Sequence, residues 1–314
     1  MTRFTEAWER FFFKAQPTST LALVRIAVGL LSLGWGLSLM PDLFEFYSSD
    51  GILPAQEANQ GSGIWGLLGI FPSDAALVAV YAALLISSVA LTLGLFTRVA
   101  ALIVFLALLS FARRNVLVLN SGDGLVRNLA LLMVFAPAGA SLSLDRLRRC
   151  RDRFWEFPER APWALRLIQI QVSVLYLSTV WQKARGLNWN DGTAVSYANR
   201  IEDLARFPLP GLLKDDILVS NLLTFGTLAV ELSLGILIWN RVLRPYVLGA
   251  GVMLHLGIEY SIRVGFFSFA VFSAYLAFVS PEAARRAILA VRDRVQAARS
   301  SRSRARARVP VRAR

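Results

Sequence analysis

The sequence predicts an all-α fold: a polytopic membrane protein with about eight transmembrane helices. Of its 314 residues, 55% are hydrophobic and only 18% are charged, and the mean hydropathy is +0.52. A soluble domain of this length has no core large enough to bury so much apolar surface. Apolar runs of about the length of a 30 Å hydrocarbon core also recur along the chain. The composition therefore excludes an ordinary soluble domain.

The chain opens with a short segment in which charged and aromatic residues alternate, Arg3 to Lys14. This pattern predicts a helix lying in the membrane interface, although an aromatic flank of the first span explains it equally well. The first predicted span is Leu21–Met40. Arg25 lies one turn inside its start, where an arginine side chain can extend to the lipid headgroups.

Seven further apolar runs follow the first span. Two of them, Val99–Ala112 and Gly124–Ala138, are short for a bilayer core, so they either include polar flanks or one is re-entrant. The expected number of spans is therefore seven to nine. The other five predicted spans are Ala76–Phe96, Trp163–Trp181, Val219–Trp239, Tyr246–Tyr260 and Val264–Val279.

The basic residues predict the orientation in a cell membrane. With eight spans and a cytoplasmic N-terminus, most of the 34 Lys and Arg residues fall on cytoplasmic flanks, and the first outer loop, Pro41–Asp74, contains none. The positive-inside rule then places both termini in the cytoplasm. We expect residues 1–285 to form the transmembrane domain and residues 286–314 a basic, disordered tail. The net charge of +13 then indicates contact with anionic lipid rather than nucleic acid.

One polar stretch, Trp181–Gly192, stands where a predicted span meets water on the extracytoplasmic side. Lys183 lies at this boundary. A lysine there is either an anchor that extends to the headgroups or a chemically active group. As a base it must be the free amine, which desolvation or the nearby Arg185 would favour.

Four ionisable residues lie within or beside the sixth and seventh predicted spans: Glu231, His255, Glu259 and Arg263. The last three are spaced by four, so in a helix they share one face. Ionisable groups in spans normally face a protein interior or a wet cavity, which makes this face a candidate polar track. Interhelical hydrogen bonds and ion pairs that fix packing are the alternative. His255 is the only histidine, so a multi-histidine metal site is excluded and no metal is expected.

Three short motifs follow one another in the chain. Asn120-Ser121-Gly122-Asp123 forms a polar loop, and Lys183 precedes Trp189-Asn190-Asp191-Gly192 by six residues. Leu254-His255 then leads to Gly265-Phe266-Phe267-Ser268 and to Ser280-Pro281-Glu282. Their order and spacing resemble the HTTM family, whose transmembrane domain is shared with vitamin K-dependent gamma-glutamyl carboxylase. The second motif is similar to the lysine and Trp-x-acid-Gly pattern of the carboxylase.

The resemblance implies a helical membrane domain with an extracytoplasmic-facing cavity for a reduced quinone of the menaquinone or vitamin K type. It implies Lys183 as the catalytic base, with His255 and Glu231 shaping the pocket. The candidate cofactor-binding residues are Asp123, Trp189, Glu259 and Arg263.

Two departures from the carboxylase pattern limit the expected activity. Ala184 stands where the carboxylase has a second lysine, and its large extracytoplasmic domain does not follow Pro281 in this sequence. Two classes of function therefore fit: a quinol-dependent membrane enzyme, and a non-enzymatic accessory factor for maturation or export of a secreted protein. A small-solute carrier ranks third, since no inverted repeat is visible.

Overall fold

The computed structural model describes residues 2–54, 66–118 and 120–307. Within these ranges the chain is almost entirely helical, which confirms the predicted all-α class. The only β-structure among named elements is a two-residue antiparallel pair, β1 (Gln16–Pro17) with β2 (Glu159–Arg160). This pair joins the segment before α2 (Ser19–Leu39) to the segment before α10 (Trp163–Lys183).

Four helical segments in the described part are long and apolar enough to cross a membrane: α2 (Ser19–Leu39), α6 (Asp74–Leu93), α10 (Trp163–Lys183) and Ile217–Trp239, which comprises α14 (Ile217–Ile236) and η3 (Leu237–Trp239). A fifth qualifies if the bent pair Phe267–Phe278 and Pro281–Ala298 is one span. The protein is therefore a multi-pass membrane protein. The eight predicted spans all coincide with helices, but their crossing of the bilayer stays a prediction.

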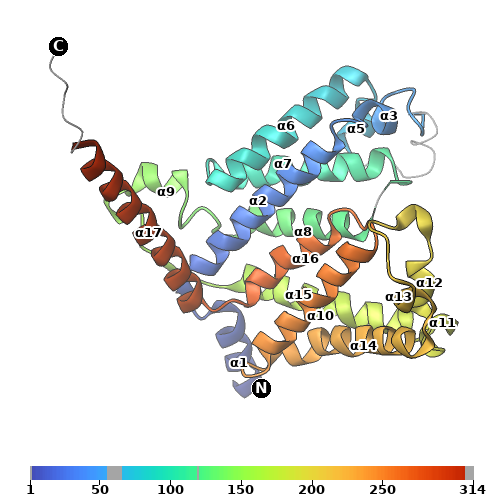
Figure 1. Ribbon diagram of the computed structural model, residues 1–314. Coiled ribbons are helices and arrows are strands. Elements are labelled where there is room, and N and C mark those ends of the chain that lie inside the picture. Colours follow the sequence, from blue (N-terminus) through green and yellow to red (C-terminus); the bar gives the residue numbers. More distant parts are fainter. Residues whose placement is uncertain (1, 55–65, 119, 308–314) are drawn as a thin grey trace, which may run out of the picture.

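Three shorter helices complete the bundle: α7 (Thr97–Arg114), α8 (Ser121–Phe135) and α15 (Arg244–Ser261). The order of packing is α2 on α6, α6 on α7 and α7 on α8, with α10, α14 and α15 as a second group. Helix α16 (Phe267–Tyr275), continued by η4 (Leu276–Phe278), lies between the groups and contacts α8, α2, α10 and α15 (Figure 1). The interior is apolar and tightly filled, for example at Leu84, Val104 and Phe111.

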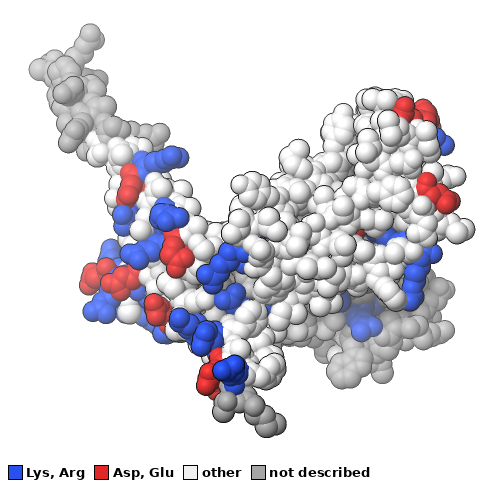
Figure 2. Space-filling view, turned by 90° about the horizontal axis from the view of Figure 1, so that it is seen from below, with Lys and Arg blue, Asp and Glu red and all other residues white. Residues whose placement is uncertain are grey.

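The outer faces of these helices are also apolar. Ile86 on α6, Leu222 on α14 and Met253 on α15 are each more than 60% exposed. In water such side chains would be costly, whereas in a bilayer they contact lipid tails. Figure 2 shows many Lys and Arg side chains, with some Asp and Glu among them, at the end where α17 (Pro281–Ala307) lies, next to a broad uncharged surface; a smaller charged group lies at the opposite end. This distribution fits a membrane-embedded bundle with one strongly charged end.

Short elements cover the two ends of the bundle (Figure 1). The end near α17 carries α9 (Leu144–Arg149) and η1 (Arg151–Arg153). The opposite end carries α3, α5, α11, α12, η2 and α13, with the bounds Leu43–Tyr47, Leu67–Ile70, Leu187–Asn190, Ala194–Asn199, Glu202–Leu204 and Gly211–Asp215.

The two terminal segments are helical. Helix α1 (Thr2–Phe13) exposes Phe4 and Trp8, while Phe12 is buried and Phe11 contacts Trp239 with ring centroids 5.8 Å apart. Its placement in a membrane interface stays a prediction.

The C-terminal region differs from the disordered tail expected from residue 286, because α17 runs from Pro281 to Ala307. Alanine and arginine, which dominate this segment, are strong helix formers. Residues 308–314 of the predicted tail lie outside the described part.

Candidate functional site

Lys183 and Glu231 form an ion pair between α10 and α14. Lys183 Nζ lies 2.5 Å from Glu231 Oε1, and the side chains are 21% and 6% exposed. Lys183 is the last residue of α10, and α14 packs against α10 along its length, which brings the carboxylate to the lysine. A buried charged side chain normally has a partner of opposite charge, and Lys183 and Glu231 are each other's partner.

Trp189 is the third member of this group. After α10 ends, Gly186 N–H bonds to the Lys183 carbonyl and Trp189 N–H to the Gly186 carbonyl, so the chain turns back on itself. The Trp189 ring then lies under the ammonium, with Lys183 Nζ 4.4 Å from the ring centroid. This cation–π contact further stabilises the charged lysine. The fold therefore brings Lys183 and Trp189, two residues of the polar stretch Trp181–Gly192, into contact.

His255 belongs to a buried hydrogen-bonded group with two tyrosines. Its Nε2 lies 2.7 Å from the Tyr176 hydroxyl, which lies 2.5 Å from the Tyr275 hydroxyl. The three residues come from α15, α10 and α16, and each is at most 5% exposed. Tyr176 and Lys183 both belong to α10, where they are seven residues, or about two turns, apart. The three predicted catalytic residues therefore lie in one region.

Two polar atoms of this region have no hydrogen-bond partner among the described residues. They are Glu231 Oε2 and His255 Nδ1, both fully buried. Buried polar atoms nearly always have a hydrogen-bond partner. Two buried atoms without one in the same region therefore need an explanation.

Glu259 lies on the same buried face of α15 as His255, but Arg263 does not continue this face. Helix α15 ends at Ser261, and Ile262 is extended, so Arg263 lies outside the helix. Glu259 is paired with Arg206, with Nη2 and Oε2 2.8 Å apart. Arg263 donates its backbone N–H to the Leu204 carbonyl. Ile262 pairs with Ala205 in an antiparallel bridge, and the helix therefore ends two residues before Arg263.

Asp123 lies in a separate cavity. It closes a capping box with Asn120 at the start of α8, and its Oδ1 accepts a 2.8 Å hydrogen bond from Trp35 Nε1. The cavity has a volume of about 310 Å³ and is also lined by Tyr47 and Gly265. Lys183, Glu231 and His255 are not among the described residues that line it. Asp123 is therefore not part of the Lys183 group.

Three important residues escaped the sequence analysis: Tyr176, Tyr275 and Arg206. The tyrosines have polar tips inside apolar runs, a signal that could have been noticed, because buried tyrosine hydroxyls need partners. Arg206 lies in a polar loop, and no sequence pattern there indicated that it pairs with Glu259. Among the described residues, no cluster of three or more His, Cys, Asp or Glu side chains could hold a metal ion.

These features define an all-helical, multi-pass membrane protein with a paired lysine and a histidine–tyrosine group inside the bundle. The chain matches the HTTM domain over residues 13–282 and belongs to the HTTM family. This confirms the resemblance seen in the motifs. Neither the search of curated proteins nor the search of solved structures found a match.

Proposed function

We propose that this protein is a quinol-dependent membrane enzyme of the carboxylase-like type, with its site at Lys183, Glu231 and His255. One observation carries the proposal. A buried histidine is hydrogen-bonded to Tyr176 on α10, the helix that ends in the lysine–glutamate ion pair, and Glu231 Oε2 and His255 Nδ1 have no partner among the described residues. Perturbed or unsatisfied ionisable groups inside a fold are typical of functional sites.

A reduced quinone fits this donor and acceptor set. It has two hydroxyl groups that need acceptors. Glu231 Oε2 is a carboxylate acceptor without a donor, and His255 Nδ1 is an acceptor in the tautomer that carries its proton on Nε2. A bound hydroquinone would supply two electrons and two protons to an acceptor such as oxygen. The residues suited to hold it are Glu231 and His255, with Trp189 and Tyr176 as aromatic neighbours.

Lys183 has the contacts of a cation rather than of a free amine. Glu231 lies 2.5 Å from its Nζ and the Trp189 face 4.4 Å away, and both interactions stabilise positive charge. Lys183 is therefore suited to stabilise a negatively charged oxygen, while Glu231 is suited to accept a proton. This assignment also fits Ala184, since no second lysine is needed.

The test is oxygen consumption by the purified full-length protein supplied with reduced menaquinone. Lys183→Gln is expected to lower the rate by about 100-fold or more, the range for loss of one acid–base or charge-stabilising group. Glutamine keeps a hydrogen-bond donor for Glu231, so the fold is expected to persist. Arg185→Gln is the matched control, because Arg185 is two residues from Lys183 but stacks on Trp181 and contacts neither Glu231 nor Trp189 in the described residues.

Binding is measured beside turnover, by quenching of tryptophan fluorescence on addition of the quinone. Wild-type protein that neither binds reduced menaquinone nor consumes oxygen above the background would refute the enzyme proposal. Equal loss of rate in Lys183→Gln and Arg185→Gln would refute the assigned role of Lys183.

We further propose that eight helices cross the cell membrane, with both termini in the cytoplasm. Support comes from α7, α8, α15 and α16, which pack side by side with the four long helices. The positive-inside rule assigns the strongly charged end at α9 and α17 to the cytoplasm. The Lys183 site then faces the extracytoplasmic side.

Cys150, the only cysteine, tests this orientation directly. It is exposed at the end of α9, on the proposed cytoplasmic side. A membrane-impermeant maleimide is expected to label it in inside-out vesicles and in detergent, but not in intact cells. Cys150→Ser gives the background. Labelling in intact cells at the rate seen in detergent would reverse the orientation.

A second candidate function is a non-enzymatic accessory factor for a secreted protein. The observation that favours it is the exposed apolar surface of the α11–α13 region, where Leu187 and Leu212 are 78% and 61% exposed. Such surface outside the spans suits a protein partner or the headgroup layer. If secretion of a substrate protein requires Leu187 and Leu212 but tolerates Lys183→Gln, this function is the better one.

A further inference from the structure

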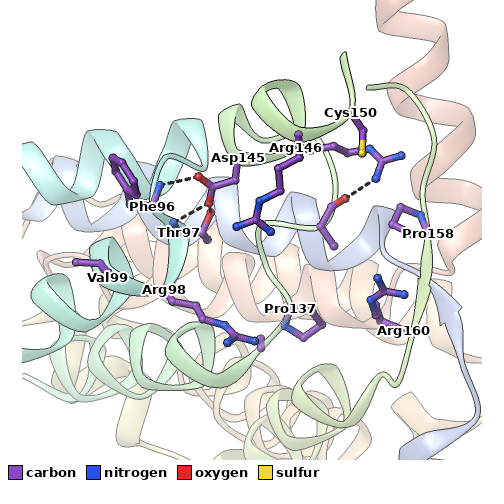
Figure 3. Close-up of a pocket in the computed structure, with 14 residues that line it drawn as sticks. Phe96, Thr97, Arg98, Val99, Pro137, Asp145, Arg146, Cys150, Pro158 and Arg160 are labelled. Carbon is purple, nitrogen blue, oxygen red and sulfur yellow. Dashed lines mark hydrogen bonds between the residues drawn. The ribbon is translucent and has the colours of Figure 1, made fainter. Parts of the chain in front are cut away.

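A large cavity lies away from the Lys183 site, at the charged end of the bundle. It has a volume of about 580 Å³. The start of α7, the segment after α8, helix α9 and the strand β2 surround it (Figure 3). Four of its lining residues are arginines from three of these segments: Arg98, Arg146, Arg149 and Arg160.

Asp145 also lines the cavity, but its carboxylate is used elsewhere. Oδ1 accepts a hydrogen bond from Phe96 N at 2.8 Å, and Oδ2 accepts from Thr97 N and Oγ1 at 2.9 and 2.7 Å. Burial works to raise the pKa of Asp145, but the hydrogen bonds from Thr97 and Phe96 outweigh it and leave the pKa below its usual 3.8. The carboxylate thus binds the N-terminus of α7 (Figure 3).

The guanidinium groups keep donors for a ligand. Arg98 makes no side-chain hydrogen bond or ion pair among the described residues, and Arg160 uses one nitrogen on the neighbouring Glu159 carbonyl. Arg146 is the most engaged: it donates to the Arg153 and Ala140 carbonyls and lies 3.5 Å from Glu156. An arginine has five N–H donors, so several remain.

The rest of the wall is apolar and continues toward lipid. Val99 follows Arg98 on α7 and is 56% exposed, and Pro137 and Ala140 stand across the cavity. A cavity with arginines at its mouth and an apolar wall on a membrane helix suits a molecule with both a charged head and an apolar body.

We propose that this cavity binds a phosphate group, supplied by the headgroup of an anionic phospholipid. Arginine forks match phosphate oxygens in geometry and in charge, and with Asp145 counted the cavity still carries three net positive charges. The lipid's acyl chains would lie along Val99 and the outer face of α7. This site is distinct from nonspecific attraction to the basic helix α17.

The experiment measures binding of three probes to the full-length protein in a neutral detergent: dioctanoyl phosphatidylglycerol, dioctanoyl phosphatidylcholine and glycerol 3-phosphate. The test variant is Arg98→Gln with Arg160→Gln. Both side chains are exposed, so the melting temperature is expected to stay the same. The matched control is Arg285→Gln with Arg286→Gln, which removes two exposed arginines from α17.

Phosphatidylglycerol is expected to bind more tightly than phosphatidylcholine. The test variant should bind phosphatidylglycerol about 25-fold more weakly, about fivefold for each arginine, while the control binds as the wild type does. Glycerol 3-phosphate binding as tightly as the lipid would support the phosphate site and assign it to a soluble ligand. Equal loss in both variants, or no preference for phosphatidylglycerol, would overturn the proposal.

Discussion

Replacing Glu231 by alanine is expected to lower the free energy of unfolding by about 3 kcal/mol. Removing one partner of a buried ion pair typically costs about 3–5 kcal/mol, because the other charge is left uncompensated. Lys183 is 21% exposed and also contacts Trp189, so part of its charge remains stabilised and the lower end of the range applies. The loss is measured by denaturant unfolding in detergent.

Removing both charges together separates the ion pair from side-chain packing. Lys183→Met with Glu231→Leu removes both charges at similar volume, and this double variant is expected to be more stable than Glu231→Ala alone. Glu202→Ala, which removes an exposed carboxylate from η2, is the control and should change stability by less than about 0.5 kcal/mol. A Glu231→Ala effect as small as the control's would show that the pair is not formed.

Replacing Gly94 by alanine is expected to destabilise the protein by about 2–5 kcal/mol. Gly94 ends α6 in the left-handed region, at φ +69°, where a side chain costs about 1–2 kcal/mol. Its Cβ would also lie 1.6 Å from Arg25 Nη1. Arg25 is fully buried and donates a 2.7 Å hydrogen bond to the Leu142 carbonyl, so it has little room to move. Such overpacking adds about 1–3 kcal/mol.

The control for this prediction is Gly226→Ala in the middle of α14. No atom lies within 4 Å of the Cβ that alanine would add there, and the backbone is helical. This substitution should be neutral or stabilise the protein by up to about 1 kcal/mol. The melting temperatures of the two variants are compared in the same detergent, and Gly94→Ala is expected to melt at the lower temperature. Similar values would contradict the close approach of Gly94 and Arg25.

The sequence by itself determined the class of protein, the position of the helices and the family. Each predicted span coincides with a helix. A run such as Val219–Trp239 can be recognised from its apolar composition, which depends only on residues that are neighbours in the sequence. The HTTM family was recognisable for a related reason. Its motifs, such as Lys183 with Trp189, are short and have a fixed spacing.

Only the tertiary structure decided which polar groups meet. Glu231 pairs with Lys183 across 48 positions and Glu259 with Arg206, whereas Arg263 left the helix that spacing assigned to it. The arginine cavity likewise joins α7, α9 and β2. Local pattern determines whether a segment is helical and apolar, but an ion pair or a cavity depends on how separate helices pack. That information is distributed over the whole chain.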